Sequence, residues 1–366
     1  MCQLMEEQVR QGLCVSAIVH ADTLNSTQGH YHWNECQIFE VKSYGQLVFV
    51  PVAPSFVIRL KKVLVSLEPD IVHIHMPNPS AFWLLLIQPL LPKKSKIIIH
   101  WHSDVLGAQP TRMVRLLYPV YQIFENALLR KAHRVIATSR PYLNSSVPLK
   151  KHLYKSEAIP LGIKIDNFAG ESGAAIGSCA TQINLLMIGR LTYYKGHLLV
   201  LKALAELKKM NRLFRLNVIG DGDLSSILKD ECAHLGLDAE VSWLGRVDEP
   251  EKCQRLSEAD LLLLPSLERT EAFGVVLLEA ANYKTAALVS DVQGSGMSYV
   301  VDAGKTGFVI NNNSVDALVK QLSSSMLDKS LLKNMGAKAK TRLHNHFDIE
   351  KVCSSITNVY EDVLNA

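Results

Sequence analysis

Apolar and polar residues alternate along this chain with two different periodicities, and together they predict a long series of strands and helices. Short unbroken apolar runs, such as residues 183–188 and 261–264, are typical of buried strands. Apolar residues spaced three and four apart, as in residues 56–67 and 197–209, indicate amphipathic helices. Further strands are expected at residues 13–19, 46–50, 70–75, 96–101, 135–139, 214–219, 240–244, 286–290 and 307–310. This alternation predicts an α/β protein with parallel sheets and crossover helices.

The pattern also divides the chain. Residues 164–181 are rich in Gly, Ala and Ser, which is typical of a linker, so we expect one domain over residues 1–163 and a second over residues 182–348. Residues 314–366 read as helical, with a last helix over residues 349–366. No internal repeat joins the halves, although both have the strand–helix order of a Rossmann-like domain.

Composition agrees with two soluble domains. The chain has 366 residues, of which 48% are hydrophobic and 20% charged. Its longest apolar run, residues 81–91, is broken by Gln88 and Pro89 and is too short to span a bilayer. The seven cysteines show no paired spacing, so neither a disulfide framework nor a zinc site is expected. Without a basic start followed by an apolar block, a signal peptide is not indicated, and we expect a cytoplasmic protein.

Charge is distributed unevenly. Residues 1–163 hold 17 Lys and Arg against 10 Asp and Glu, a net charge of +7, which leaves −3 of the total +4 for the rest. A basic first half predicts an anionic partner, either a membrane surface or a phosphate-bearing acceptor, although ordinary solvated lysines fit equally well. Residues 112–134 mix aromatic and basic side chains on one predicted helix. That helix could lie on an anionic membrane, but a core-facing helix with a solvated basic side is favoured.

The most informative stretch is residues 265–296, PSLERTEAFGVVLLEAANYKTAALVSDVQGSG. It places Glu271 in a strand-to-helix turn and Glu279 eight residues later, within the helix. At about 1.5 Å per residue, the two carboxylates can hold separated parts of one elongated ligand. Between them, the backbone N–H groups around Phe273, Gly274 and Val275 and the helix dipole form an anion site. Two acceptors flanking an anion site suit a sugar nucleotide.

A second loop, residues 189–196, reads GRLTYYKG and follows the first strand of the second domain. Its two glycines allow close backbone approach, and Arg190 and Lys195 can converge on one diphosphate. Gly220 also follows a strand, where a tight turn alone would explain it.

The PSLERTEAFG…EA stretch resembles the E-x7-E signature of the retaining glycosyltransferases of family 4. The resemblance implies the GT-B fold, two Rossmann-like domains facing across a cleft, with the last helix packing back on the first domain. It implies that Glu271 meets the transferred sugar, that Arg190 and Lys195 bind the donor diphosphate, and that Gly220 shapes the donor loop. Glu279 is expected to accept from the ribose hydroxyls, as acidic residues do in other nucleotide folds.

The same resemblance assigns a histidine that reaches the donor sugar. His102 follows the strand 96–101, at the carboxyl end where open α/β sheets bind ligands, so this role falls to His102. His100, two residues earlier on the same face, is interpreted as structural.

Two features depart from the family pattern. Residues 158–163, AIPLGI, resemble the IPNGI turn between the domains, but Leu161 stands where asparagine is usual. Met1 falls where the first helix is already under way, so the first strand and its glycine loop, about 20 residues, are expected to be absent. The activity of this chain is in question on that account.

The predicted reaction is transfer of a glycosyl group from a nucleoside diphosphate sugar, with retention and without a metal or cofactor. No D-x-D pair or His/Asp cluster that would hold a metal stands out. Residues 294–309, GSGMSYVVDAGKTGFV, are similar to bacterial members that build surface polysaccharide, so a glycan or lipid-linked glycan acceptor at the inner face of the membrane is expected, and no nucleic acid.

Three alternatives stay open. The chain could be an inactive homologue acting as a binding subunit, or an epimerase on the same GT-B scaffold. A nicotinamide enzyme is the third, and the lack of G-x-G-x-x-G between a strand and a helix counts against it.

Overall fold

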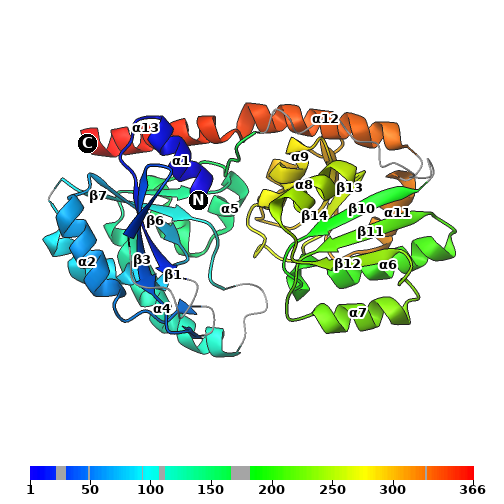
Figure 1. Ribbon diagram of the computed structural model, residues 1–366, viewed down its shortest axis with the longest axis horizontal. Helices are drawn as coiled ribbons and strands as arrows, with labels where there is room; N and C mark the ends of the chain where they lie inside the picture. Colours follow the sequence, from blue (N-terminus) through cyan, green and yellow to red (C-terminus); the bar gives the residue numbers. More distant parts are fainter. Residues whose placement is uncertain (22–29, 48–49, 93, 107–111, 166–181, 326–327) are drawn as a thin grey trace. The chain divides into compact units, whose positions relative to one another are not determined.

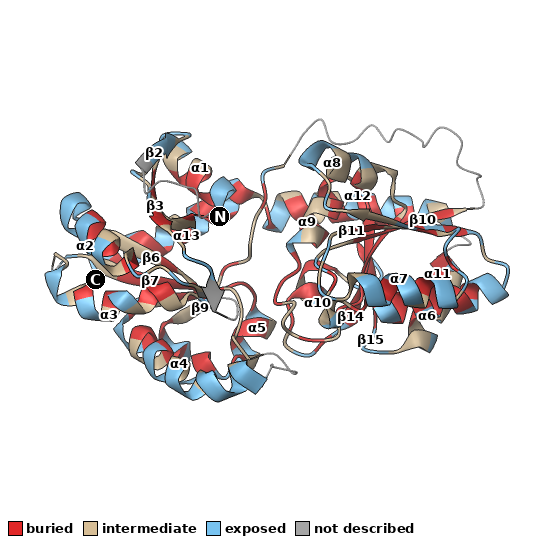
Figure 2. Cartoon of the chain, turned by 60° about the horizontal axis from the view of Figure 1, so that its bottom comes forward, coloured by how far each residue is buried: buried red, intermediate tan, exposed pale blue. Residues whose placement is uncertain are grey.

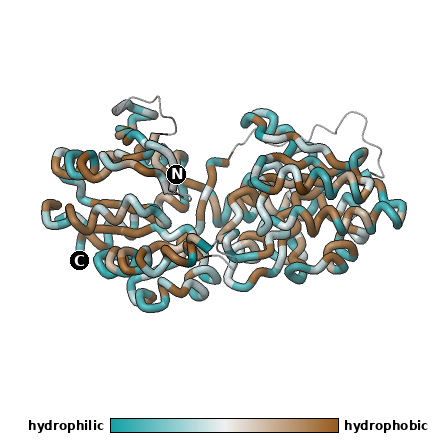
Figure 3. Tube along the Cα trace, turned by 90° about the horizontal axis from the view of Figure 1, so that it is seen from below, coloured by the Kyte–Doolittle hydropathy of each residue, from teal (hydrophilic) through white to brown (hydrophobic). Residues whose placement is uncertain are grey.

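The computed structural model divides the chain into two compact units. It describes all residues except 22–29, 48–49, 93, 107–111, 166–181 and 326–327. Unit 1 comprises Met1–Pro160 together with Ile349–Ala366, and unit 2 comprises Leu161–Asp348. The predicted linker, residues 164–181, lies outside the described residues apart from its first two. In both units hydrophobic segments, brown in Figure 3, run through the interior.

Unit 2 is built on six parallel strands in the order β12-β11-β10-β13-β14-β15. Their bounds are β10 Ile183–Ile188, β11 Phe214–Ile219, β12 Val241–Gly245, β13 Leu261–Leu264, β14 Ala286–Asp291 and β15 Gly307–Asn311. All four residues of β13 are buried leucines, as its unbroken apolar run predicts for a strand covered on both faces. The predicted second parallel sheet is therefore confirmed.

Helices cover both faces of that sheet (Figure 1). One face carries α6 His197–Lys209, α7 Ser225–His234 and α11 Val315–Ser325, which share a core with alternate strand residues. The other carries α8 Glu249–Glu258, α9 Val275–Asn282, α10 Met297–Val300 and part of α12 Lys329–His346. The bounds of α6 agree with those expected from the apolar spacing, because the helix has one continuous buried side.

The larger sheet of unit 1 contains four parallel strands in the order β6-β7-β8-β9. These are β6 Ile71–Met76, β7 Lys96–Trp101, β8 Arg134–Ala137 and β9 Ser156–Ala158. The connecting helices are α2 Phe56–Leu67, η1 Pro79–Trp83, α3 Leu84–Ile87, η2 Gln88–Leu90, α4 Arg112–Lys131, α5 Arg140–Ser145 and η3 Pro148–Lys155. Trp101 and the isoleucines of β7 are among the most deeply buried side chains of the unit.

A second, three-stranded sheet in unit 1 was not expected from the sequence. Strand β1, Ser16–Ala21, pairs in parallel with β3, Cys36–Lys42, which also forms an antiparallel hairpin with β2, His30–Trp33. The short strand predicted at residues 46–50 is replaced by a ribbon of β4 Gln46–Leu47 and β5 Val50–Pro51. Within the described residues no backbone ladder joins this sheet to β6. The expected absence of a first strand and glycine loop stays a prediction.

The first and last helices of the chain lie side by side in unit 1 (Figure 1). Helix α13, Ile349–Asn365, packs against α1, Cys2–Arg10, and the side chain of Gln8 donates to the hydroxyl of Tyr360 at 2.9 Å. One face of α13 is buried with residues of β7 and β8 in a single apolar core. Seven side chains of α13 are buried there, namely Ile349, Val352, Cys353, Ile356, Val359, Tyr360 and Val363.

Helix α4 corrects an expectation. The sequence favoured a core-facing helix with a solvated basic side, but only three of its side chains are buried, Glu125, Leu128 and Leu129. Figure 2 shows long exposed stretches along this helix. The exposed apolar side chains are Met113, Leu116, Leu117, Val120, Ile123 and Phe124. The prediction fails because the apolar spacing fixes which residues share a face, but not whether that face meets the core or solvent.

Among the described residues, no helix is both long and apolar enough to cross a membrane.

Candidate functional site

The two signature loops of unit 2 leave neighbouring strands. Strand β10 is followed in the chain by β11 and β12 on one side of it, whereas β13, β14 and β15 continue on its other side. The strand order therefore reverses between β10 and β13. In open α/β sheets, ligands bind beyond the carboxyl ends of the strands at such a switch point. The 189–196 loop follows β10 and the 265–274 loop follows β13, so the fold brings both motifs to that place.

Glycines let these loops pack backbone against backbone. A Cβ atom on Gly220 would lie 2.0 Å from the carbonyl oxygen of Gly189, and one on Gly196 would lie 2.3 Å from that of Pro265. Gly196 also has φ +78° and Gly220 φ +134°, conformations that side chains disfavour. In addition, the backbone N–H of Leu267 donates to the carbonyl of Tyr194 at 2.7 Å. Gly220 thus acts through its lack of a side chain, which lets the turn after β11 pack against Gly189 at the start of the 189–196 loop.

Lys195 and Glu271 form an ion pair between the two loops. The Nζ of Lys195 donates to Oε2 of Glu271, and the hydroxyl of Ser266 donates to the same oxygen at 3.4 Å. The two side chains are only 13% and 12% exposed. The Lys195 side chain also passes 3.2 Å from the position that a Cβ on Gly189 would occupy. Two residues predicted from separate motifs are thus in direct contact.

Arg190 is not part of this pair. Its side chain is exposed, and no salt bridge to it is found within the described ranges. The structure therefore leaves Arg190 at the surface of the same loop, from which its long side chain can reach an anion.

Helix α9 begins directly after the second loop. Gly274 caps it with φ +82°, and a Cβ there would lie 2.9 Å from Cδ1 of Leu277. The ring of Phe273 is buried and meets Phe347 edge-on at 6.0 Å between centroids. Phe273 can therefore offer a ligand only its backbone. Val275 is the first helical residue, and the first N–H groups of a helix have no partner within it.

Glu279 lies within α9 and pairs with a residue that the sequence did not single out. The Nζ of Lys252, on α8, donates to Oε1 of Glu279 at 3.1 Å and lies 3.0 Å from Oε2 of Glu249. Burial lowers the pKa of Lys252, but the charges of Glu279 and Glu249 outweigh it and leave the pKa raised. Only the packing of α8 against α9 identifies Lys252, because an isolated lysine on a predicted helix carries no signal.

His102 belongs to unit 1, whereas the other predicted site residues belong to unit 2. It follows β7 directly, and its backbone N–H donates to the carbonyl of Met76 at 2.9 Å. Its Nε2 lies 2.8 Å from Nδ1 of His75, which stands near the end of β6. Burial lowers the pKa of His102 to about 4. The ring is thus held neutral and hydrogen-bonded near neutral pH.

The loop after His102 is fixed by Asp104. The indole Nε1 of Trp101 donates to Oδ1 of Asp104 at 2.9 Å, and the hydroxyl of Ser146 donates to the same oxygen at 2.6 Å. The backbone N–H of Asp104 also donates to the hydroxyl of Tyr142 at 2.6 Å. These contacts set the direction in which the chain leaves β7.

Four histidines share one face of β6 and β7, which the sequence reasoning missed. His73 and His75 alternate along β6, and His100 and His102 alternate along the next strand, with His75 directly opposite His100. Burial, with a further contribution from the neighbouring imidazoles, lowers the pKa of His73 to about 3 and those of His75 and His100 well below the ordinary value. In the sequence no His/Asp cluster that would hold a metal stood out, whereas in the structure His75, His100 and His102 form a group of close ring nitrogens. Its signal was the H-x-H pair in each of two adjacent strands.

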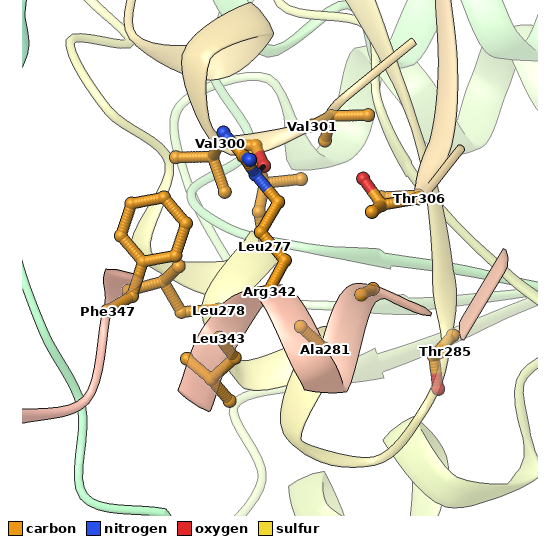
Figure 4. A pocket seen from close by; sticks show the side chains of 12 residues that line it. Leu277, Leu278, Ala281, Thr285, Val300, Val301, Thr306, Arg342, Leu343 and Phe347 are labelled. Carbon is orange, nitrogen blue, oxygen red and sulfur yellow. Dashed lines mark hydrogen bonds between the residues drawn. The ribbon is translucent and has the colours of Figure 1, made fainter. Parts of the chain in front are cut away.

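A small cavity lies beneath α9. Figure 4 shows it between α9 and α12, enclosed mainly by apolar side chains such as Leu277, Leu278 and Leu343. Its volume of about 20 Å³ is close to that of a single water-sized probe. Arg342 closes one side and donates to the carbonyls of Val300 and Tyr299 at 3.0 and 2.7 Å. This cavity is a packing defect below the helix and is far too small for a sugar nucleotide.

Comparison with known proteins identifies the family. A model described as "Glycosyl transferase 4-like domain" matches residues 1–145, and one described as "Glycosyl transferases group 1" matches residues 174–342. The chain belongs to the family 4 glycosyltransferases, which have the GT-B fold. As a family 4 member it is a glycosyltransferase, and the resemblance seen in its motifs is confirmed.

Named relatives of this family 4 chain are bacterial glycosyltransferases. It is 24% identical over 367 residues to the O-antigen chain mannosyltransferase C of Escherichia coli, covering 100% of this chain and 93% of that protein. It is 29% identical over 246 residues to the D-rhamnosyltransferase WbpZ of Pseudomonas aeruginosa, covering 66% of this chain and 60% of the relative.

Solved structures agree on the fold. The sucrose-phosphate synthase of Thermosynechococcus elongatus superimposes with a TM-score of 0.82 at 20% identity, over 99% of this chain and 92% of that one. HepE of Anabaena, solved with UDP and glucose, gives a TM-score of 0.69 at 18% identity, over 90% and 87%. The two-domain α/β GT-B architecture is therefore shown.

Proposed function

We propose that this glycosyltransferase moves a sugar from a nucleoside diphosphate sugar to a hydroxyl of a glycan acceptor, with retention at the anomeric carbon. The observation that carries the proposal is the Lys195–Glu271 pair, which joins the loops after β10 and β13 at the switch point of the unit 2 sheet. A cation and an anion fixed side by side match a donor whose diphosphate is charged and whose sugar carries hydroxyl donors.

Lys195 can bind Glu271 and the donor diphosphate at the same time. An ammonium group has three donors, of which Glu271 uses one, so the others can bind diphosphate oxygens. The start of α9, with Gly274 and Val275, adds backbone donors and the positive end of a helix dipole. Arg190, exposed on the same loop as Lys195, supplies a second cation. Glu271 then lies where it accepts hydroxyls of the transferred sugar.

These residues would stabilise the charge that develops during the reaction. When the bond between the anomeric carbon and the diphosphate breaks, its electron pair stays on the diphosphate oxygen, and the sugar ring becomes positive. Lys195, Arg190 and α9 stabilise that leaving oxygen without a metal ion. The acceptor hydroxyl attacks from the face that the diphosphate leaves and gives its proton to the diphosphate. His102 contacts the donor sugar, and Glu279 accepts from the ribose hydroxyls.

The acceptor is proposed to be a growing bacterial surface glycan on a lipid carrier. Support comes from the relatives named as an O-antigen chain mannosyltransferase and a phosphatidyl-myo-inositol mannosyltransferase, the second of which names a lipid. A lipid-borne acceptor requires the enzyme to work at a membrane surface.

The exposed face of α4 fits that requirement. Leu116 and Ile123 are 78% and 65% exposed, and they lie on one stripe with Met113, Val120 and Phe124. Exposed arginines on the same helix, Arg112 and Arg115 at its start and Arg130 near its end, complement anionic headgroups. An apolar stripe accompanied by cations is the pattern of a helix that lies in a membrane interface. We therefore propose that α4 docks unit 1 on the anionic inner face of the cytoplasmic membrane.

The proposed roles of the donor-binding residues are tested by measuring both the binding of nucleoside diphosphate sugars and the rate of sugar transfer. The protein is assayed against a panel of nucleoside diphosphate sugars for transfer to lipid-linked glycan acceptors and for release of the diphosphate. Lys195→Ala should lower kcat/KM by about 10²–10³, the usual loss when a preorganised charge-stabilising donor is removed. Glu271→Gln should lower turnover while leaving affinity for the nucleoside diphosphate nearly unchanged, because Glu271 contacts the sugar of the donor and not its nucleoside diphosphate. Glu279→Gln should weaken that affinity, because it meets the ribose.

Lys209→Ala is the matched control, since Lys209 is an exposed lysine of the same unit, paired with Glu206 on the surface of α6. A Lys195→Ala protein that turns over as fast as the Lys209→Ala protein would refute the role of the pair. Donor binding without transfer or diphosphate release would favour a binding subunit, and a changed sugar configuration would favour an epimerase.

A further inference from the structure

Three of the four histidines on β6 and β7 bring ring nitrogens close together. One ring nitrogen from each of His75, His100 and His102 lies within 4.8 Å of the other two. His75 and His102 lie almost in one plane, 12° apart, and are joined edge to edge by their 2.8 Å hydrogen bond. The ring of His100 is parallel to that of His102, with 4.5 Å between centroids.

His100 gives this cluster an unusual property. Its side chain is only 1% exposed, yet neither of its ring nitrogens has a hydrogen-bond partner within the described part of the chain. A buried polar group without a partner destabilises a fold by roughly 1–3 kcal/mol, so such a group calls for a function or a ligand. The hydrogen bond between His75 and His102 satisfies those two residues and leaves His100 unsatisfied beside them.

We propose that His75, His100 and His102 form a binding site for a divalent transition metal such as Zn²⁺ or Ni²⁺. Imidazole is a preferred ligand of these ions, and three histidines are a sufficient protein ligand set when water or another small ligand completes the coordination. Zn–N bonds of about 2.0–2.1 Å at tetrahedral angles place ligand nitrogens about 3.3 Å apart. Side-chain rotations that shorten the longest separation, at most 4.8 Å, bring the three nitrogens to that spacing.

Metal binding does not change the number of protons on the three imidazoles. Each neutral imidazole carries one proton, and the proton shared between His75 and His102 now lies where the ion binds. The ring that donates it changes tautomer and carries its proton on the other nitrogen, so both rings present a lone pair. His75 and His102 are half-buried, which leaves an approach from solvent, while His100 closes the site from the interior.

Metal binding would also affect catalysis, and this consequence rests on the proposed function. Coordination turns the ring of His102 toward the ion, so that the ring no longer takes the orientation in which it contacts the donor sugar. Occupancy of the site should therefore inhibit transfer reversibly, and a chelator should restore it.

The test titrates the purified full chain with ZnCl₂ and NiCl₂ by calorimetry, with MgCl₂ for comparison. One ion should bind per chain, and Mg²⁺ should not compete, because it prefers oxygen ligands. His75→Gln should weaken binding by at least the roughly 10- to 100-fold that loss of even an outer-shell partner causes. His102→Gln serves as a second variant should His75→Gln fail to fold, which its melting curve reveals. His346→Gln, at an exposed histidine of unit 2, should bind like the unaltered chain.

Exposed thiols could mimic this result, so the ligands are identified directly. Cys2 and Cys14 are exposed, and Co²⁺ bound to thiolate gives a near-ultraviolet charge-transfer band that imidazole does not. A Co²⁺ spectrum without that band supports the site. Stoichiometric binding that survives in both His75→Gln and His102→Gln, a thiolate band, or no binding at all would overturn it. Because binding is read without turnover, a failure of the transferase assay leaves this result intact.

Discussion

Lys195 owes its position to residues that carry no charge. Its side chain passes over Gly189, and Gly196 allows the 189–196 loop to approach Pro265. The sequence could predict Lys195 and Glu271 separately, because each stands in a contiguous motif. It could not predict that the two side chains bind each other, since that contact depends on how closely the loops after β10 and β13 pack. Lys252 was missed for the same reason.

Glu125 is a residue whose burial makes stability depend on pH. It is 0% exposed on α4, and its Oε2 accepts from the hydroxyl of Tyr118 at 3.3 Å. Burial raises the pKa of Glu125 to about 7, a rise that the Tyr118 hydrogen bond reduces. Below its ordinary pKa the carboxyl is protonated in both the folded and the unfolded chain. Between that value and about 7 the unfolded chain loses the proton first, so stability falls as pH rises.

We expect Glu125→Gln to remove this dependence. At pH 8 the variant should be more stable than the unaltered chain by on the order of 2 kcal/mol, and near pH 4 the two should be alike. Urea unfolding at several pH values measures the difference. Glu361→Gln, at an exposed acid of the same unit, is the control. A Glu125→Gln effect that does not change with pH would contradict the assignment.

Among the elements, those with one continuous buried side were predicted best. The bounds of α2, α6 and β7 match their apolar patterns, because burial and periodicity agree there. The β2–β3 hairpin was missed because its turn is Asn34-Glu35, with φ of +46° and +66°, where glycine usually supplies the signal. Helix α4 was assigned the wrong environment although its existence was predicted correctly.

At the scale of the elements, the exposed apolar stripe of α4 leads to a prediction about membrane binding. Replacing Leu116 and Ile123 together by Glu should reduce binding to vesicles that contain anionic lipid by about tenfold or more, because apolar burial and charge attraction are both lost. Sedimentation with vesicles, with and without added salt, measures binding.

Ile227→Glu is the matched control, since Ile227 is an apolar side chain of α7 in unit 2 with similar exposure, 58%. Equal loss of vesicle binding in the two proteins, or none in either, would show that α4 is not the docking surface.

At the scale of the whole molecule, the two loop motifs of unit 2 were visible in the sequence and the histidine cluster was not. Residues 189–196 and 265–279 are contiguous segments, so a sequence shows them whole. The cluster arises only when β6 pairs with β7 in the register that sets His75 opposite His100. A pattern along one strand cannot report such pairing between strands. The predicted domain boundary likewise rests on a contiguous signal, the Gly- and Ser-rich segment between two strand–helix series.

The separate cores of the two units predict separate responses to mutation. Ile356 of α13 is fully buried with residues of β7 and β8. Ile356→Ala should destabilise unit 1 by about 2–5 kcal/mol through the cavity it leaves. Amide hydrogen exchange should then accelerate in residues 1–160 and stay unchanged in residues 182–325.

Leu364→Ala, at a residue of α13 that is 44% exposed, should change stability by no more than about 0.5 kcal/mol. Faster exchange throughout unit 2 in the Ile356→Ala protein would show instead that the two units unfold together.

The placement of α13 has a consequence for how the protein is made. Unit 2 is inserted between two parts of unit 1, and its ends meet where the N–H of Ile163 donates to the carbonyl of Phe347 at 3.1 Å. During synthesis the ribosome therefore completes unit 2 before it produces the helix that closes the core of unit 1. Until α13 emerges, apolar residues of β7 and β8 stand uncovered, and they are natural sites for a chaperone to hold.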